Sequence, residues 1–304
     1  MELLQKAILQ TLIYADIFDY PLVSQELYRF LITDEALSYS YFRKALSRIV
    51  ANDERINTNK GFYFLKGREK TVKLREKRKL GSEDKEKIAG RVADWFKLIP
   101  WVKIIGITGA LAMENADEGD DVDLLIVTTR NRLWLTRFFL ILLTELTGVR
   151  RRPQDKSASW RNKICLNIFL DEDHLEMPRK QRNIYIAHEV CQVKLLWERN
   201  STYQKFLWEN RWVSKFLPNF LDTKILRYKD IKIKKQKSLS IVMSRYLNIF
   251  LNFLEKVVYK IQLSYMRSRK TSEKTEQYRA FFHPDDCTSW VLKRYNQKLS
   301  KLNF

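Results

Sequence analysis

The first 66 residues combine helical spacing of hydrophobic positions with two short strand-like runs. Apolar residues recur every three or four positions until Tyr20-Pro21, and the same spacing returns over residues 25–31 and 41–50. Two short runs follow, at 55–58 and 61–65, on either side of Asn59-Lys60-Gly61. A turn of this composition between two short strand-like runs is typical of a β-hairpin. The pattern therefore predicts three helices and then a hairpin.

Three helices followed by a hairpin resemble a winged helix-turn-helix domain. In that family the third helix enters the major groove of DNA and the wing contacts the phosphate backbone. The resemblance implies that Arg43, Lys44 and Arg48 on the third helix, together with Lys60 in the hairpin, contact DNA or RNA. The alternative is a winged domain that serves protein interaction or packing.

Residues 67–99 predict a helical connector in two parts. The stretch 66–79 is basic, and Gly81-Ser82 interrupts the helical pattern. A second helix is expected over 85–98, with apolar residues such as Val92 on its inner face, and Pro100 ends it.

Two strand-like runs flank a polar loop in the centre of the chain. Residues 102–107 and 122–128 are short, apolar and rich in β-branched side chains. Asp121 and Asp123 lie two positions apart at the start of the second run, so their side chains point to the same face of a strand. Neighbouring carboxylates repel each other unless a cation bridges them, and oxygen ligands of this kind suit Mg²⁺ or Mn²⁺.

The segment 103–170 resembles the polymerase beta-like nucleotidyltransferase superfamily. The signature of that superfamily is a strand, a Gly-Ser turn, a loop and then Asp-x-Asp on the next strand; here Gly109 lies twelve positions before Asp121. The resemblance implies that Asp121 and Asp123 are catalytic residues that bind the metal ions. It also implies that the turn formed by Thr108, Gly109 and Ala110 lies against the phosphates of a nucleoside triphosphate.

Several positions depart from the pattern of that superfamily. Ala110 stands where a serine is usual, and Glu114 and Asp120 replace small residues, although the backbone N–H groups of the turn remain as donors to phosphate. The family also carries a third carboxylate on a strand in the region of residues 163–170. In this chain the polar residue within that run is Asn167, which accepts no proton, and Asp171 follows at its end. Either Asp171 supplies the third catalytic carboxylate or the site is depleted.

A triple arginine follows the central pair of strands. Asn131 is expected to cap a helix that runs to residue 146 and ends at Gly148. Arg150, Arg151 and Arg152 come directly afterwards, and they either bind a triphosphate or nucleic-acid backbone or form a solvated loop.

Residues 181–304 predict a basic helical domain. The first helix is expected to continue from residue 184 through Trp197. His188 and Cys191, three positions apart, are candidate metal ligands or, more simply, buried packing residues. A long amphipathic helix is expected over 238–266. One of its faces carries Leu247, Phe250, Leu254, Val257, Val258, Ile261 and Tyr265, and another Asn248, Asn252, Lys256 and Lys260.

The net charge and the cysteine content indicate which kinds of binding partner and which cellular compartment to expect. The 304 residues carry a net charge of +20, and residues 224–304 hold 19 Lys and Arg against 6 Asp and Glu. This surplus favours a polyanionic partner: a nucleic acid, a nucleotide or an anionic membrane surface. Three dispersed cysteines and an N-terminus without a signal-peptide plan favour the cytoplasm. The most apolar segment, 133–146, is too short to span a bilayer, so no integral membrane segment is expected.

Together these features predict an α+β fold with a nucleotidyltransferase-like central mixed sheet. The expected domains are a winged helix-like domain at 1–66, a connector at 67–99, the nucleotidyltransferase-like core at 100–180 and the helical domain at 181–304. The expected function is metal-dependent transfer of a nucleoside monophosphate from an NTP to an acceptor hydroxyl, with Mg²⁺ or Mn²⁺ as cofactor. One alternative is a catalytically depleted nucleic-acid-binding or regulatory, antitoxin-like protein. Another is a peripheral membrane adaptor that uses the basic helix at 238–266. The acceptor, the nucleotide choice and the oligomeric state stay open.

Overall fold

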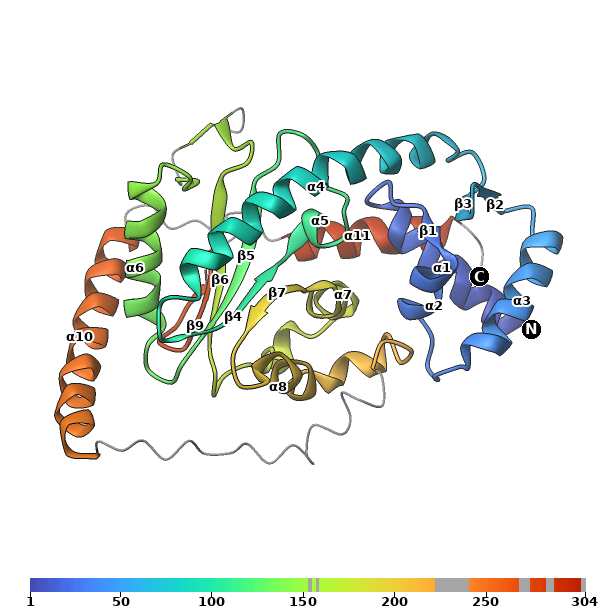
Figure 1. Ribbon diagram of the computed structural model, residues 1–304. Coiled ribbons are helices and arrows are strands. Elements are labelled where there is room, and N and C mark those ends of the chain that lie inside the picture. The colour runs from blue at the N-terminus through green and yellow to red at the C-terminus, as the bar shows by residue number, and fades with distance from the viewer. Residues whose placement is uncertain (153–154, 157–158, 222–240, 268–273, 283–286, 302–304) are drawn as a thin grey trace.

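The protein folds into a mixed α+β structure with two sheets (Figure 1). The computed structural model describes residues 1–152, 155–156, 159–221, 241–267, 274–282 and 287–301. The α+β class predicted from the sequence is confirmed. Among these residues, no helix combines the length and the apolar composition that crossing a lipid bilayer requires.

The predicted N-terminal helices and hairpin are all present. The helices are α1 (Glu2–Asp16), α2 (Ser24–Arg29) and α3 (Tyr39–Asn52), and the strands are β1 (Leu22–Val23), β2 (Ile56–Asn59) and β3 (Phe62–Leu65). Lys60 and Gly61, between β2 and β3, have φ values of +52° and +79°, as the centre of a tight two-residue hairpin turn requires. Strand β1 was not predicted; it pairs antiparallel with β3 and gives the sheet order β1-β3-β2.

A single helix, α4 (Lys70–Phe96), replaces the two helices predicted on either side of Gly81-Ser82. Ser82 is fully buried, and its hydroxyl accepts a backbone N–H from a neighbouring loop. Lys85, one turn further on, is also buried and donates to the carbonyl oxygen of Asp120 at 2.5 Å. A glycine in a helix costs about 1 kcal/mol relative to alanine, and these tertiary contacts offset it. The predicted break was therefore wrong.

Within the described residues, the central sheet has six strands in the order β7-β4-β5-β6-β9-β8. Its strands are β4 (Val102–Ile107), β5 (Val122–Thr128), β6 (Ile164–Asp171), β7 (Lys194–Glu198), β8 (Lys274–Thr275) and β9 (Arg279–Phe281). Strands β4 and β5 are antiparallel, whereas β5 and β6 are parallel, so the sheet is mixed as predicted. The first three strands coincide with the three predicted ones.

Strands β7, β8 and β9 come from the part of the chain that was predicted to be wholly helical. The apolar residues of β7 follow helix α7 (Ile184–Gln192) directly, and a short apolar run has no period that separates helix from strand. Strand β7 instead pairs with the free edge of β4, whose backbone groups require partners. Val193 packs so closely on Gly106 of β4 that a Cβ there would lie 2.8 Å from the Cγ1 atom of Val193. The all-helical prediction for residues 181–304 was wrong.

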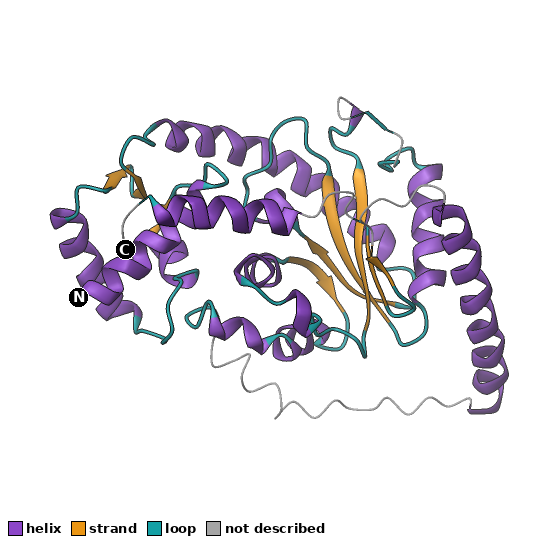
Figure 2. Cartoon of the chain, turned by 180° about the vertical axis from the view of Figure 1, so that it is seen from behind, coloured by secondary structure: helices purple, strands orange, loops and turns teal. Residues whose placement is uncertain are grey.

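Helices surround the central sheet and connect it to the N-terminal unit. The remaining helices are α5 (Gly109–Ala112), α6 (Leu133–Leu146), α8 (Thr202–Glu209), α10 (Ile241–Arg267) and α11 (Cys287–Ser300), with 3-10 turns η2 (Arg179–Gln181) and η3 (Arg211–Lys215). Helices α6 and α10 pack side by side at one end of the molecule, and α11 runs back to contact α1 (Figure 2). One hydrophobic core joins Tyr14 of α1, Leu125 of β5, Val190 of α7 and Tyr295 of α11. The N-terminal unit therefore packs directly on the central part of the fold.

Candidate functional site

The turn after β4 and the start of β5 lie against each other, as the sequence pattern predicted. The N–H of Thr108 donates to the carbonyl oxygen of Asp123 at 3.0 Å, which continues the β4–β5 pairing into the turn. Gly109 has a φ of +65°, and a Cβ at this position would lie 3.2 Å from Oδ2 of Asp123. Ala110 follows in the first turn of α5. Only a glycine gives this backbone conformation and this close approach without strain.

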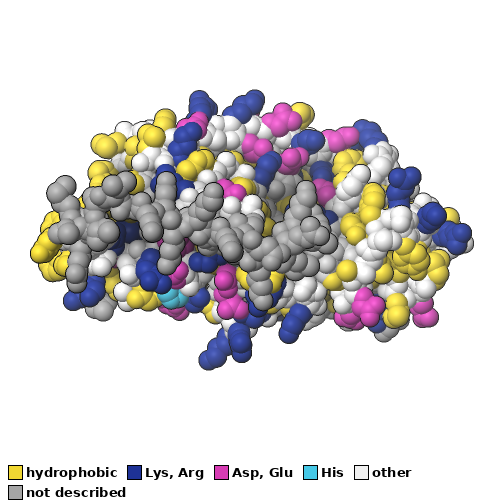
Figure 3. All heavy atoms as spheres, turned by 60° about the horizontal axis from the view of Figure 1, so that its bottom comes forward, with side chains coloured by type: hydrophobic (Ala, Val, Ile, Leu, Met, Phe, Trp, Pro, Cys, Tyr) yellow, Lys and Arg dark blue, Asp and Glu magenta, His cyan; other side chains and the backbone are white. Residues whose placement is uncertain are grey.

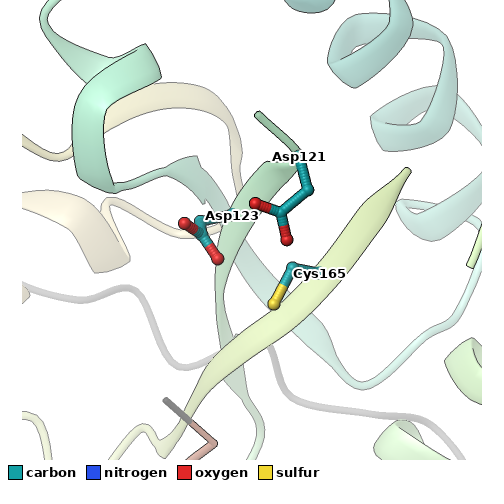
Figure 4. A group of neighbouring side chains, drawn as sticks. All are labelled: Asp121, Asp123 and Cys165. Carbon is teal, nitrogen blue, oxygen red and sulfur yellow. The ribbon is translucent and has the colours of Figure 1, made fainter. Parts of the chain in front are cut away.

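Asp121 and Asp123 face each other, with Cys165 of β6 beside them (Figure 4). One ligand atom from each residue lies within 4.8 Å of the others. The parallel pairing of β5 and β6 places Cys165 directly opposite Asp123. Burial, and then the charges of Asp123 and Asp121, raise the pKa of the Cys165 thiol well above its usual range. The thiol is therefore protonated at neutral pH in this arrangement, and it is a weaker candidate ligand than the two carboxylates.

Arg151 is the arginine of the triple run that reaches the aspartates. Its Nη1 donates to Oδ2 of Asp121 at 2.6 Å, and its guanidinium lies over the ring of Trp160 at 3.7 Å from the centroid. Both members of the ion pair are largely buried, so Arg151 offsets part of the negative charge of the aspartate cluster.

The other two arginines of the run lie elsewhere. Arg150 and Arg152 both pair with Glu145 of α6, at 2.7 Å and 2.6 Å, and they line a separate surface groove. The three arginines were predicted to act together because they are consecutive in the sequence. Successive residues in an extended stretch, however, point in different directions. The expectation that Arg150 and Arg152 lie with the aspartates is therefore corrected.

Asp171 does not join the aspartate cluster. It lies at the far end of β6, opposite Thr128, whereas Cys165 marks the cluster's end of the same strand. Its Oδ2 accepts from the N–H of Asn131 at 2.7 Å and its Oδ1 from the N–H of Asp173 at 3.0 Å, so it organises the loops at that end. The prediction that Asp171 supplies a third carboxylate at this centre is corrected. Asp171 and the aspartate cluster lie at opposite ends of β6.

A cavity of about 320 Å³ opens beside the aspartates. Its walls come from α1, the α5 turn, the start of β5, α7 and α11. The polar lining includes Thr108, Asp120, Asp121, Asp123, Glu189 and Gln192, and the aromatic lining includes Tyr14, Phe18, Tyr20, Phe30, Tyr185 and Trp290. Thr108 is 4% exposed, and its hydroxyl has no hydrogen-bond partner among the residues described. A buried hydroxyl at a cavity wall that has no protein partner is available to a bound group or to water in the cavity.

Glu189 is a site residue that the sequence did not reveal. It lies on α7 and lines the same cavity as the aspartates. Burial, and then the charge of Asp123, raise its pKa to about 7. Its surroundings in the sequence are an ordinary amphipathic helix, so only the folded chain brings this carboxylate to the site.

His188, the neighbour of Glu189, serves packing rather than metal binding. Its ring stacks on Tyr14 with the centroids 3.9 Å apart, and its Nδ1 donates to the carbonyl oxygen of Ile184 at 3.0 Å. The side chain is 3% exposed, and burial lowers its pKa to about 4. These contacts agree with the packing interpretation of His188.

The buried His188 predicts a pH dependence of stability. The unfolded chain takes up a proton below about pH 6.5, whereas the folded chain resists until about pH 4, so stability falls as the pH decreases between these values. The contribution lost is about 3 kcal/mol. Urea unfolding of wild type and His188→Phe, measured from pH 7.5 to 4, should give a steeper loss for wild type. Parallel curves of stability against pH for the two proteins would contradict this prediction. Glu189 is present in both proteins, so its contribution to the pH dependence cancels in the comparison.

The predicted nucleic-acid contacts lie apart from this cavity. Arg43, Lys44 and Arg48 are exposed on the outer face of α3. Lys60, in the hairpin turn, is also exposed and pairs with Glu76 of α4 at 2.8 Å. None of the four lines the cavity.

Comparisons with known proteins add no family to these observations. No protein-family model matches the chain, and neither a curated protein nor a solved structure is significantly similar to it. The function is therefore argued from the geometry of the site.

Proposed function

We propose that this protein binds a nucleoside triphosphate with a divalent metal ion and transfers its nucleoside monophosphate to an acceptor hydroxyl. One observation carries the proposal: Asp121 and Asp123 face one cavity beside the Gly109 turn. This agrees with the sequence resemblance to the polymerase beta-like nucleotidyltransferases, whose fold we propose for β4 to β6. The cavity is within the range of volumes that small-molecule sites occupy.

The donor set fits a hard divalent cation. Asp121 and Asp123 supply carboxylate oxygens, which Mg²⁺ and Mn²⁺ prefer. A bound metal ion would neutralise phosphate charge as the bond to the α-phosphorus is exchanged.

The side chains of this chain would then act in the following way. The acceptor oxygen forms a bond to the α-phosphorus, the bond to the bridging oxygen breaks, and pyrophosphate leaves. Glu189 is the carboxylate in the cavity that is available to take the proton of the acceptor hydroxyl. The Thr108 hydroxyl donates to a phosphate oxygen. The aromatic side chains of α1 and α11 exclude water and offer flat surfaces to a nucleobase.

Gly109→Ala tests the role of the turn. The change forces a Cβ onto a residue with positive φ, which costs about 1 kcal/mol, and it crowds Asp123. We expect a loss of metal-dependent nucleotide affinity of at least about 10-fold, which fluorescent-nucleotide titration measures. Gly61→Ala is the matched control, because Gly61 also has a positive φ but no atom within 4 Å of the added Cβ. Equal affinities in the two variants would contradict the proposed role of the turn.

A screen of the four nucleoside triphosphates, each labelled on the α-phosphate, tests the activity. Each is incubated with Mg²⁺ or Mn²⁺ and with total cellular RNA, protein or small-molecule extract as acceptor. We expect wild type to transfer label from one or more of them, and the Asp121→Asn/Asp123→Asn variant to transfer none. The absence of transfer to every acceptor, together with no metal-dependent nucleotide binding, would overturn the proposal.

A second candidate is a depleted, non-catalytic relative that binds nucleic acid. Two observations favour it: Arg151 already pairs with Asp121, and β6 places Cys165 rather than a carboxylate opposite Asp123. In this case α3 and the β2–β3 hairpin would contact the nucleic acid through the exposed basic residues described above. A salt-sensitive gel shift that Arg43→Gln/Lys44→Gln weakens, without transfer of any label, would select this candidate.

A further inference from the structure

Several polar side chains of helix α10 contact α6 and the loop before it. Asn248 and Asn252 accept from the Arg132 guanidinium at 3.0 Å and 2.6 Å. Glu255 is 5% exposed and accepts from the N–H groups of Trp134 and Leu135, at 2.8 Å and 2.9 Å, in the first turn of α6.

Further along the helix the same face stays polar. Gln262 is also buried, and it donates to the carbonyl oxygen of Trp134 at 2.9 Å. The inner face of α10 therefore combines polar contacts to α6 and the loop before it with packing of Val258, Tyr259 and Met266 on the core.

The outward face of α10 is apolar. Large hydrophobic side chains project from it over about five turns, each between 56% and 72% exposed. They include Tyr246, Ile249, Phe250, Phe253, Ile261 and Tyr265. Hydrophobic side chains gather at this end of the molecule (Figure 3). Of the apolar face named from the sequence, Leu247, Phe250, Ile261 and Tyr265 are exposed, whereas Leu254, Val257 and Val258 are partly buried.

The charges on this outward face are positive. Lys256 and Lys260 are exposed, one turn apart, between Phe253 and Ile261. Glu255 is the only acidic residue in the sequence of α10, and it faces inward. The outer face therefore combines aromatic and aliphatic side chains with cations and carries no anion.

Exposed apolar side chains are also present on the neighbouring helix α6. Phe138, Phe139, Leu142 and Leu146 are between 41% and 77% exposed on its outer side. Phe139 also lines an apolar groove of about 530 Å³ next to the end of α4. Two adjacent helices with apolar outer faces form a patch of the kind that marks an interaction surface.

We propose that the outer face of α10, with that of α6, docks on an anionic membrane surface. Phospholipid bilayers offer an apolar layer directly beneath negatively charged headgroups, which matches aromatic and aliphatic side chains flanked by Lys256 and Lys260. The Lys stems extend along the apolar face while their amines reach the headgroups. A second copy of the chain would cover the apolar side chains but would place the lysines against each other. A nucleic acid would match the lysines but would leave the aliphatic side chains uncovered.

Vesicle flotation of the full-length protein tests this docking. The vesicles are phosphatidylcholine alone or phosphatidylcholine with one third phosphatidylglycerol. The variants are Phe250→Gln/Phe253→Gln and Lys256→Gln/Lys260→Gln. Lys73→Gln/Lys77→Gln on α4 is the matched control, because both lysines are exposed and have the same spacing on a helix. Circular dichroism checks folding, and analytical ultracentrifugation gives the oligomeric state of each protein.

The proposal predicts that wild type floats with the anionic vesicles and much less with phosphatidylcholine alone. The lysine pair should lower the affinity by roughly 30-fold and the phenylalanine pair by at least about 10-fold, whereas the α4 control should not change it. Failure of folded wild type to float with anionic vesicles overturns the proposal. Flotation that neither α10 variant weakens also overturns it. If wild type does not float and is instead a dimer, and if Phe250→Gln/Phe253→Gln makes it monomeric, the outer face of α10 binds a second copy of the chain.

Discussion

Asp121→Asn/Asp123→Asn is expected to abolish metal-dependent nucleotide binding in a chain that remains folded. The two carboxylates face the same cavity and are the only carboxylates of the described acidic and cysteine cluster. Their replacement by neutral amides removes both charges at nearly constant volume. Loss of even an indirect metal contact costs 10- to 100-fold, so we expect a loss of at least about 100-fold. Titration of a fluorescent ATP analogue with and without Mg²⁺ measures it.

Glu118→Gln is the matched control for this double variant. Glu118 lies in the loop before β5, and its exposed side chain pairs with Arg161 rather than lining the cavity. It should bind nucleotide as wild type does. Unchanged Mg²⁺-nucleotide affinity in a folded Asp121→Asn/Asp123→Asn protein would refute the role of the aspartates.

Glu255→Ala is expected to lower the free energy of unfolding by about 3 kcal/mol. The carboxylate accepts two buried N–H groups at the start of α6, where the helix dipole favours a negative charge. Alanine leaves both N–H groups without that acceptor and removes the central contact between α6 and α10. Urea unfolding at neutral pH measures the change.

Glu255→Gln separates the charge from the hydrogen bonds. An amide oxygen can still accept from the backbone, so this variant should lose less stability than Glu255→Ala. Lys256→Gln, next to it but exposed, should change stability by less than about 0.5 kcal/mol. If Glu255→Ala unfolds at the same urea concentration as wild type, the contact between α6 and α10 does not hold the helix in the orientation described.

The local pattern of residues was enough to predict the N-terminal helices, the hairpin and the β4–β5 pair. In each case the information lies within a few residues: the turn at Asn59-Lys60-Gly61, or the two aspartates at the start of an apolar run. Strand β7 was missed because its apolar residues fit a helix or a strand equally well, and only the open edge of β4 decides between them.

The composition of the cavity could not be predicted from the sequence. Its walls come from α1, β5, α7 and α11, and these elements lie far apart in the sequence, with α1 near its start and α11 near its end. Glu189 belongs to no sequence motif, and Asp171 follows the expected strand but lies at the end of β6 away from Asp123. Contacts over such separations depend on tertiary packing.

The amphipathic pattern of α10 illustrates a different limit. Periodicity shows that a helix has two faces, but it does not say which face the protein covers. Here Asn252, Glu255 and Gln262 satisfy the polar groups at the start of α6, so the fold uses the polar face and leaves Phe250 and Phe253 outward. Only the contacts of each side chain in the folded protein show which face is covered.

The central claim is that Asp121 and Asp123 hold a divalent ion and a nucleoside triphosphate in the cavity beside Gly109. A crystal structure with Mn²⁺ and a non-hydrolysable ATP or GTP analogue, using the anomalous signal of manganese, tests it most directly. The account predicts a manganese peak about 2 Å from oxygens of both carboxylates, with the phosphates next to the turn. A crystal that binds neither ion nor nucleotide there, with Arg151 still paired to Asp121, would contradict it.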